Sequence, residues 1–264
     1  MTDRLCFVIA VLAIALSAST PEDYKLEDHM AVHHTFTGDK TINVDLVNGS
    51  VTVIGDGGST IHVDGERVIR AANQDQMDRA KKENVLDINE KDGVAQLYEN
   101  GPFRSSERAS DFHGFHDTER REYQVVWNVT AHVPRETALR LRSVNGSVAA
   151  QDISGSTEAR SVNGALVATF RENPKADSSF TTVNGKIDLI FQPGLSADFE
   201  LKTVNGGMYT DFASTPLASA GTAAKENGKF VFKSRGESRI RIGSGGPEIR
   251  VETVNGSIQI QKSK

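Results

Sequence analysis

Apolar residues recur along this chain in short alternating runs, and the runs meet at the tripeptide Val-Asn-Gly. The tripeptide occurs six times, with its asparagines at Asn48, Asn145, Asn163, Asn184, Asn205 and Asn255. From Asn145 to Asn205 the spacings are 18, 21 and 21 residues, and Asn227 in AKENGKFVFK follows 22 residues later as a degenerate copy. A fixed period of this size is the signature of stacked repeats. The sequence therefore predicts coils of about 18–22 residues piled on one another.

The Asn-Gly pair has two structural interpretations, a hairpin turn or a corner. In a two-residue hairpin Thr182 would lie opposite Ile187 on one face, so that face would mix polar and apolar side chains. The same mismatch occurs in four other copies, and a strand pair needs one consistent apolar face. We therefore interpret Asn-Gly as a corner within a coil, chosen because both residues tolerate left-handed backbone geometry.

Aligning the coils on the asparagine sorts the other positions into columns, four of which are apolar and predicted to point inward. These columns are Leu141, Ala159, Phe180, Leu201 and Val251; Val144, Val162, Val183, Val204 and Val254; Val148, Leu166, Ile187, Met208 and Ile258; and Ala150, Ala168, Leu189 and Ile260, with Thr210 as the exception. Steps of two residues predict strands, and the longer steps beside the asparagine predict corners. Coils about 4.8 Å apart would pair their backbones and join the asparagines in a ladder of amides.

A different pattern interrupts the repeat before its second copy. NQDQMDRAKKENV predicts a short helix capped by Asn73, with i,i+4 pairs between Asp75 and Arg79 and between Asp78 and Lys82. The next segment predicts a hairpin about Asp92-Gly93. The expected fold is thus all-β, a single-stranded β-solenoid with one helix and one hairpin inserted near its N-terminal end. Its expected parts are a flexible leader over 20–36, a single domain over 37–264, a helix-hairpin insertion at 65–98, and exposed loops at 99–121 and 213–228.

The first 19 residues have the layout of a secretory signal peptide. An apolar run from Leu5 to Leu16 is too short to span a bilayer and is followed by small residues that suit cleavage. The one cysteine, Cys6, lies inside this segment, so the mature chain is expected to hold no thiol. We expect export to the periplasm, the cell surface or the medium, with no transmembrane span in the mature chain.

The order of these elements resembles the bacterial putative-adhesin family known as domain of unknown function 4097. The resemblance covers residues 37–261 and is carried by VNGSVTV, the charged helix, HVPRETALRLRSVNGSV and the closing IRVETVNGSIQIQ. It implies a β-solenoid on exported or envelope-associated proteins and offers no catalytic residues. The chain departs from that pattern in the histidine-containing loop at 111–117 and at Glu226.

Composition and motifs point away from several classes of chemistry. Thirty basic residues against 35 acids give a formal charge of −5, so a nucleic-acid partner is not expected. Two histidine clusters, His29, His33 and His34 in DHMAVHH and the pair in DFHGFHD, lie in segments expected to be mobile and are interpreted as solvated side chains. No metal, cofactor or catalytic residue is predicted. On the outward columns only Asp188 and Asp211 could serve a polysaccharide-cleaving enzyme.

Two outward columns offer binding surfaces. The first is filled by hydroxyl residues, namely Ser143, Ser161, Thr182, Thr203 and Thr253. We interpret them as partners of corner backbone groups, with a flat hydroxyl ladder for glycan or ice as the alternative. The second is partly basic and predicts a ligand-binding stripe of Arg142, Arg160 and Lys202 for anionic envelope polymers, against the alternative of a solvated charged face.

The predicted function is a non-catalytic exported adhesin or envelope-binding module whose partner is envelope polysaccharide or a surface protein. A polysaccharide-active β-helix enzyme and a periplasmic signalling or scaffold partner stay open.

Overall fold

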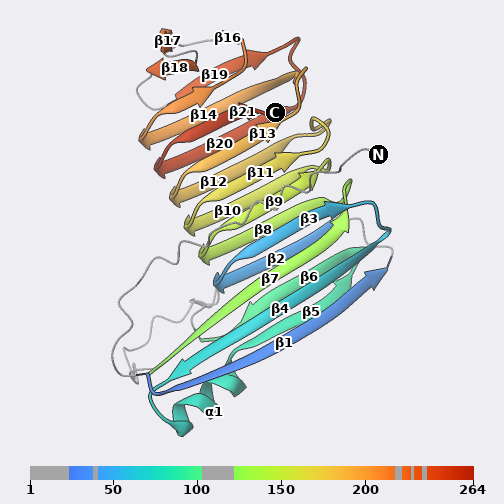
Figure 1. The fold of residues 1–264 in the computed structure, drawn as a ribbon, viewed down its shortest axis with the longest axis vertical. Coiled ribbons are helices and arrows are strands. Elements are labelled where there is room, and N and C mark those ends of the chain that lie inside the picture. The colour runs from blue at the N-terminus through green and yellow to red at the C-terminus, as the bar shows by residue number, and fades with distance from the viewer. Residues whose placement is uncertain (1–23, 38–40, 103–121, 218–221, 227–228, 234–236) are drawn as a thin grey trace, which may run out of the picture.

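The computed structural model describes residues 24–37, 41–102, 122–217, 222–226, 229–233 and 237–264. These residues form two large sheets and one helix, which confirms the all-β class (Figure 1). In the described part of the chain no helix is long and apolar enough to cross a membrane.

The two sheets have mixed strand directions, and the order of their strands in space differs from the order in the sequence. From edge to edge, the eleven-stranded sheet contains β1 (Leu26–Thr37), β4 (Thr60–Ala71), β7 (Tyr123–Pro134), β3 (Val51–Asp56), β9 (Val148–Ile153), β11 (Leu166–Phe170), β13 (Ile187–Phe191), β21 (Ile258–Lys262), β15 (Met208–Thr210), β18 (Lys229–Lys233) and β17 (Thr222–Glu226). The ten-stranded sheet contains β16 (Ser214–Pro216), β19 (Glu237–Ile242), β14 (Ala197–Asn205), β20 (Glu248–Asn255), β12 (Ser178–Asn184), β10 (Thr157–Asn163), β8 (Ala138–Asn145), β2 (Thr41–Asn48), β6 (Val94–Asn100) and β5 (Val85–Lys91).

Each Val-Asn-Gly joins a strand of the ten-stranded sheet to a strand of the eleven-stranded sheet. We call such a joined pair a rung; the six rungs are β2/β3, β8/β9, β10/β11, β12/β13, β14/β15 and β20/β21. Neighbouring rungs pair in parallel with like positions together, as in Asn145 with Asn163 and Asn163 with Asn184. The corner interpretation of Asn-Gly therefore agrees with these parallel registers, because a hairpin would have made the flanking strands antiparallel neighbours.

The rungs do not stack in the order of the sequence. The last rung, β20/β21, lies between β12/β13 and β14/β15 and pairs in parallel with both, and Figure 1 shows it as red strands set between gold and orange ones. The expectation that the series continues at Asn227 is wrong. β17 and β18 on either side of that position pair antiparallel, with Glu226 opposite Lys229, while Asn227 itself lies outside the described residues.

Both ends of the stack are closed by antiparallel strands, which departs from a coil that is single-stranded throughout. At one end β1, β4 and β7 pair antiparallel, and β5 and β6 form the predicted hairpin with Asp92 and Gly93 at positive φ. At the other end β19 pairs antiparallel with β14 and β16. A stack that ended on a parallel rung would expose a full row of unpaired peptide groups, so the ends need such caps. The flexible leader and the loop at 213–228 are accordingly corrected, because they contain β1, β16 and β17.

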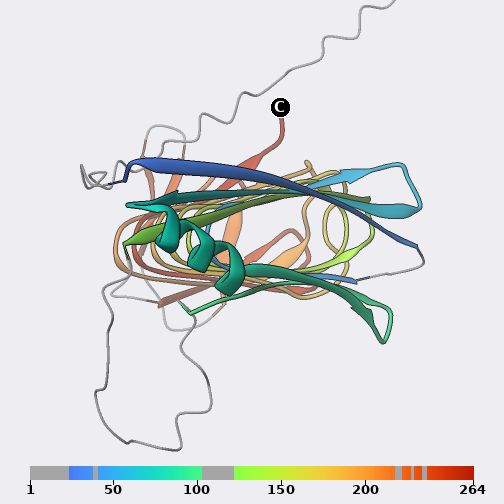
Figure 2. The ribbon, with the colours of Figure 1, turned by 90° about the horizontal axis from the view of Figure 1, so that it is seen from below.

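The predicted helix forms as α1 (Gln74–Glu83) and lies across the end of the stack in the view from below (Figure 2). Asn73 caps it as expected by accepting a hydrogen bond from the Gln76 backbone, and Met77 and Ala80 are its buried residues. Its side-chain pairs differ from the expected ones, since Gln74 donates to Asp78 and Arg79 pairs with Glu83.

Three of the four predicted inward columns lie in one continuous core, and the valine column does not. Val162, Val183 and Val204 are 37%, 37% and 64% exposed, while Ser161 and Thr182 are buried. The reason is that each strand continues its alternation up to the asparagine, so the hydroxyl residue points inward and the following valine points outward. The outward assignment of the hydroxyl column was therefore wrong, as was the inward assignment of the valines.

Close stacking, and not left-handed backbone, explains the glycine of the corner. Of the six corner glycines only Gly49 has a positive φ, and none of the six asparagines does. A Cβ on the other five would collide with the carbonyl oxygen of the corner glycine on the adjacent rung. The glycines therefore form a column in which successive backbones approach more closely than any side chain allows. The five are Gly146, Gly164, Gly185, Gly206 and Gly256.

We expect Gly164→Ala to destabilise the protein by about 2–4 kcal/mol, because the new methyl overlaps the Gly146 carbonyl and the stack cannot open at one corner alone. Denaturant unfolding measures the change. Gly57→Ala is the matched control, since its nearest neighbour is the Arg135 side chain at 3.6 Å, an ordinary contact. Equal stability of the two variants would contradict the stacking argument.

Candidate functional site

The asparagine side chains of the corners form one continuous row at the surface. From the second rung onward, each Nδ2 donates to the Oδ1 of the asparagine on the preceding rung in space, with distances of 2.7–2.8 Å. The row therefore has a direction and spans the sheet stack from the first rung to the last. In spatial order it is Asn48, Asn145, Asn163, Asn184, Asn255 and Asn205.

Two further rows of hydrogen bonds lie behind the amides. The Thr182 hydroxyl donates to the Gly164 carbonyl at 2.9 Å, and the Gly164 amide donates to the Asn184 carbonyl at 3.1 Å. Ser143, Ser161, Thr203 and Thr253 make the equivalent hydroxyl bond to a corner glycine of the neighbouring rung. These hydroxyls are buried and point into the corner, which confirms the backbone-pairing interpretation. The alternative of an exposed hydroxyl ladder for glycan or ice is thereby excluded.

A buried carboxylate closes the first corner, where no further rung follows. Glu99 of β6 is 1% exposed and accepts hydrogen bonds from the backbone amides of Val47 and Asn48 at 2.6 and 3.1 Å. A carboxylate that accepts two amide bonds replaces the peptide carbonyls that another rung would offer. The corner rows are thus satisfied internally, which makes them structural elements more than binding groups.

The predicted basic stripe does lie in one row, on the outer face of the ten-stranded sheet. Register places Arg142 beside Arg160 on neighbouring strands, with Lys202 farther along the same row. Each of the three has a carboxylate partner: Arg142 with Asp45 at 3.9 Å, Arg160 with Glu158 at 3.0 Å and Lys202 with Glu252 at 2.8 Å. The row is therefore charge-compensated and not a purely basic stripe.

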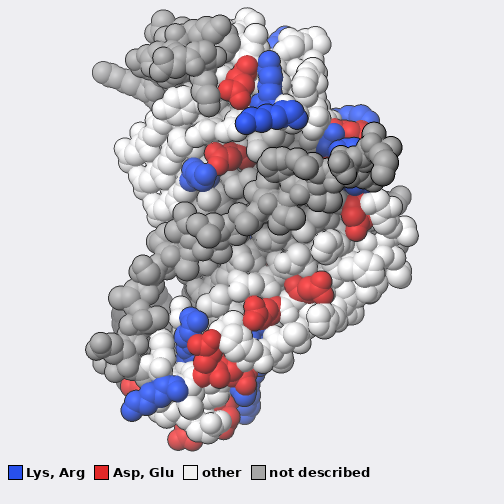
Figure 3. All heavy atoms as spheres, viewed as in Figure 1, with Lys and Arg blue, Asp and Glu red and all other residues white. Residues whose placement is uncertain are grey.

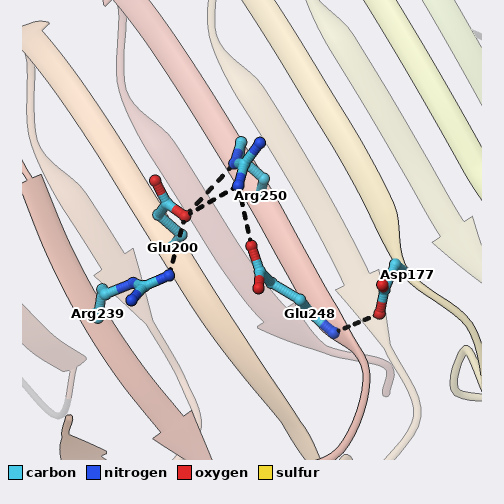
Figure 4. A network of polar contacts seen from close by, with 5 residues as sticks. All are labelled: Asp177, Glu200, Arg239, Glu248 and Arg250. Carbon is cyan, nitrogen blue, oxygen red and sulfur yellow. Dashed lines mark hydrogen bonds and ion pairs between the residues drawn. The ribbon is translucent and has the colours of Figure 1, made fainter.

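The adjacent part of the same face carries a network of alternating charges (Figure 4). Glu200 of β14 contacts Arg239 of β19 and Arg250 of β20, both at 3.3 Å, and Arg250 also contacts Glu248 at 3.0 Å. The Glu248 backbone amide donates to Asp177 at 2.8 Å. This network links β20 to β14 on one side and to Asp177, which directly precedes β12, on the other.

A second pair on this face, between β14 and β19, has the geometry of a fork. Arg241 donates through Nε and Nη2 to the two oxygens of Asp198, both at 2.7 Å. Hydrogen bonding to Arg241 lowers the pKa of Asp198 below its usual range. Figure 3 views the other side of the molecule, where β1 and β4 of the eleven-stranded sheet face the viewer, and there too acidic and basic side chains lie beside one another.

A shallow depression of about 420 Å³ lies on this face over β12. Register places the short Ser179 between Glu158 of β10 and Arg250 of β20, so two long side chains flank a small one. Arg140 completes the rim, and within the described part of the chain it forms no ion pair. Arg140, Ser179 and Arg250 were not predicted from the sequence. The column that contains them was readable from the repeat, but it carries no regular residue type.

The first histidine cluster lies on β1, a regular strand and not a mobile segment. His29 contacts Glu66 of β4 and Glu27 at 3.1 and 2.8 Å, and His33 contacts Asp64 at 2.6 Å. These contacts raise the pKa of His29, the largest cause being its hydrogen bond to Glu66. Within the described ranges no group of three or more His, Cys, Asp or Glu side chains could hold a metal ion. The second cluster, at 111–117, lies outside the described residues.

The two candidate catalytic carboxylates belong to separate strands of the eleven-stranded sheet. Asp188 of β13 pairs with Lys186 at 2.7 Å, whereas Asp211 follows β15 and accepts a hydrogen bond from the Lys262 backbone at 3.4 Å. β21 lies between β13 and β15, and Asp211 is two residues farther along than the position opposite Asp188. The structure does not bring them together as a facing pair.

Comparison with known proteins finds no matching family model and no matching curated protein. Among solved structures the chain is similar to a putative cell adhesion protein from Clostridium sporogenes, with 10% identity over 89% of this chain and 100% of that chain and a TM-score of 0.49. It is also similar to a putative adhesin from Bacteroides fragilis, with 10% identity over 89% and 97% of the two chains and a TM-score of 0.32. A putative lipid binding protein from Parabacteroides distasonis shares 9% identity over 91% and 98% with a TM-score of 0.25. Similarity at this level carries no argument about activity, which has to be argued from the residues.

We expect Thr182→Val to lower the free energy of unfolding by about 1–3 kcal/mol, because the Gly164 carbonyl loses its buried donor. Thr182→Ser keeps the hydroxyl and is the control. Denaturant unfolding of the three proteins measures the effect. A valine variant as stable as the parent would show that the inner hydroxyl row contributes nothing.

We expect NMR titration to place the pKa of His29 above its ordinary value of about 6.5. Glu66→Gln should move it back down, because the largest cause of the shift is removed. Since the folded pKa is raised, the contribution of His29 to docking β1 is fully present below about pH 6.5 and is lost as pH rises through the folded pKa. An unchanged His29 titration in Glu66→Gln would contradict the assigned contact.

Proposed function

We propose that this protein is a non-catalytic, exported binding module of the putative-adhesin type, whose outer face on the ten-stranded sheet binds cell-envelope polysaccharide. The parallel rungs are then the coils of a β-solenoid of the kind seen in the family of domain of unknown function 4097. The single observation that carries the proposal is the compensated charge array that runs across neighbouring rungs on one face. Export is supported by the signal-peptide layout of the first 19 residues.

The scaffold supports this proposal because it is stiff and repetitive. Each corner of the stack carries a backbone bond, a hydroxyl bond and an amide bond to its neighbour, so outward side chains are held at one strand spacing of about 4.8 Å. A polymer of repeating sugars meets such a face with repeating contacts, and the weak contacts add through multivalency.

The chemistry of the face favours a ligand rich in hydroxyls over one with a strong net charge. Arg142, Arg160 and Lys202 are 56%, 60% and 48% exposed, and exposed ion pairs contribute at most about 1 kcal/mol each. A sugar hydroxyl can therefore insert between the two charges at little cost and bind both. The depression over Ser179, rimmed by Arg140, Glu158 and Arg250, offers the same alternation of donors and acceptors.

No arrangement of the described residues favours the enzyme alternative, since Asp188 and Asp211 are not opposed across a common groove. The alternative of a periplasmic signalling or scaffold partner shares the same fold and differs in its ligand. The other partner predicted for a binding module, a surface protein, would show as binding that soluble glycans do not compete.

We expect the triple variant Arg142→Gln, Arg160→Gln and Lys202→Gln to lose roughly tenfold in affinity for isolated peptidoglycan sacculi, because each side chain contributes a fraction of a kcal/mol to binding. Cosedimentation measures the retained fraction. Lys91, Lys175 and Lys186, all exposed and away from this row, supply a control triple with the same loss of charge.

Circular dichroism and the unfolding midpoint show that both triple variants fold. Equal retention of the two triples would remove the row from the proposal, and turnover of the glycan by the parent protein would replace it with the enzyme alternative. Retention that survives excess soluble glycan would favour the surface-protein partner.

A further inference from the structure

The last rung in the sequence, β20/β21, does not lie at the end of the row of rungs. β20/β21 follows β14 to β19 along the chain, yet it separates the rung β14/β15 from β12/β13 (Figure 1). The rung β14/β15 therefore makes no strand pairing with the rung that precedes it in sequence. The C-terminal rung holds the two together by pairing with both.

The C-terminal rung lies in a slot whose two walls are the rungs β12/β13 and β14/β15. Both walls present the same pattern to it. Phe180 and Leu201 lie on either side of Val251, and Asn184 and Asn205 lie on either side of Asn255. The asparagine and hydroxyl bonds across one wall have equivalents across the other, as in Asn255 to Asn184 and Asn205 to Asn255, each 2.7 Å. The strand pairing is more extensive on one side, since β21 pairs over five residues with β13 and over three with β15. The slot therefore fits a rung that carries this column pattern, and the same rung from a second copy of the chain fits it equally well.

The C-terminal rung is also a complete, separable unit. Its inward residues Ile249, Val251, Ile258 and Ile260 are fully buried, so its contacts with the slot are extensive. One covalent link, residues 243–247, connects it to β19.

That link, which we call the hinge, is a tight turn that contains glycine. Gly243 and Gly245 have φ of 62° and 79°, values that favour glycine. β19 and β20 flank β14, so the link crosses about 10 Å and reverses the chain. Five residues span at most about 17 Å, which leaves enough length for that reversal but little to spare.

The contacts that fasten the rung at the surface are exposed and weak. Arg250 contacts Glu200 at 3.3 Å, and the Glu248 amide donates to Asp177 at 2.8 Å, as Figure 4 shows. Exposed pairs of this kind contribute little to stability and are screened by salt. The rung is held chiefly by burial and backbone pairing, which another copy supplies in full.

We propose that two copies of this chain exchange their C-terminal rungs, residues 248–262, so that each fills the slot of the other. The contacts in the exchanged dimer are the same as in the single chain, so the balance depends on chain concentration and on strain in the hinge. The interaction surface is therefore the slot itself, and the partner is a second copy of this chain.

A pair of cysteines across one wall of the slot reports the exchange directly. Glu200 and Arg250 are opposite one another on β14 and β20, and their exposed side chains can be replaced without disturbing the core. Adjacent strands lie about 4.8 Å apart, within the Cα range of a disulfide. In full-length Glu200→Cys/Arg250→Cys, with Cys6→Ser, the disulfide links one chain to itself when the rung is its own and links two chains when the rung is exchanged.

The matched control places cysteines on strands that both stay with the body of the chain. Asp198 and Arg241 are opposite one another on β14 and β19, and their side chains form an exposed pair like the first. Each protein is held near 1 mM in mild urea, returned to buffer, oxidised, and run on a non-reducing denaturing gel. We expect covalent dimers in on the order of a tenth of the β14–β20 chains, since effective concentrations across short links are in the millimolar range.

Shortening the hinge provides a second and stronger test. Deleting Ser244 and Gly245 leaves three residues, which reach only about 10 Å and cannot also reverse the chain. In this background we expect the Glu200→Cys/Arg250→Cys protein to elute as a dimer at micromolar concentration and to be mostly covalent dimer after oxidation. The unfolding midpoint checks that the shortened protein folds cooperatively.

Covalent dimers in the β14–β20 pair alone, increased by the shorter hinge, support exchange. Covalent dimers in both cysteine pairs, or in neither, overturn it, and so does a shortened protein that folds as a monomer with its disulfide within one chain.

Discussion

The close approach of successive backbones at the corner glycines is the constraint on which the rest of this structure depends. A Cβ at Gly146 or Gly164 would collide with the carbonyl of the glycine beneath it, so the corner exists only where no side chain intrudes. Because the glycines touch, the hydroxyl of Thr182 reaches the Gly164 carbonyl and the asparagines reach one another. The three rows of bonds are consequences of one steric fact. A backbone this tightly stacked holds its outward side chains in register, and the charged face is the result.

Much of this architecture could be predicted from the sequence, because the spacing of a repeat reflects the lengths of its strands and the positions of its corners. The period, the corners, the asparagine row, the capped helix and the Asp92-Gly93 hairpin follow from spacing and from the chemistry of a few residue types. The valine before each asparagine misled because apolar character is a weak guide at a corner, where burial depends on which way the last strand residue points. Ser and Thr point inward there because a backbone carbonyl accepts their hydroxyls, and a buried hydroxyl with a partner costs little.

The charged face shows a different limit of sequence reasoning. Arg142, Arg160 and Lys202 were identified as a column. Asp45 and Glu252, the partners of Arg142 and Lys202, lie in that same column on neighbouring strands, and Glu158 lies two residues before Arg160 on its own strand. Register alone places Asp45 beside Arg142, and side-chain reach alone joins Arg160 to Glu158. A stripe that looks basic in one column is neutral once its neighbours are counted, which changes the ligand that it suits from a polyanion to a polyol.

The order of the rungs was beyond the sequence for a reason that also gives the slot its character. When every rung presents the same columns, a rung pairs as well with one neighbour as with another, and the repeat does not specify which comes next. The choice falls to the segments that do not repeat. β19 pairs antiparallel with β14 and occupies its outer edge, so the only parallel edge left for β20 is the inner one, between β14 and β12. Irregular strands therefore determine where regular ones go, and the position they leave for the C-terminal rung is one that the same rung from another chain fits equally well.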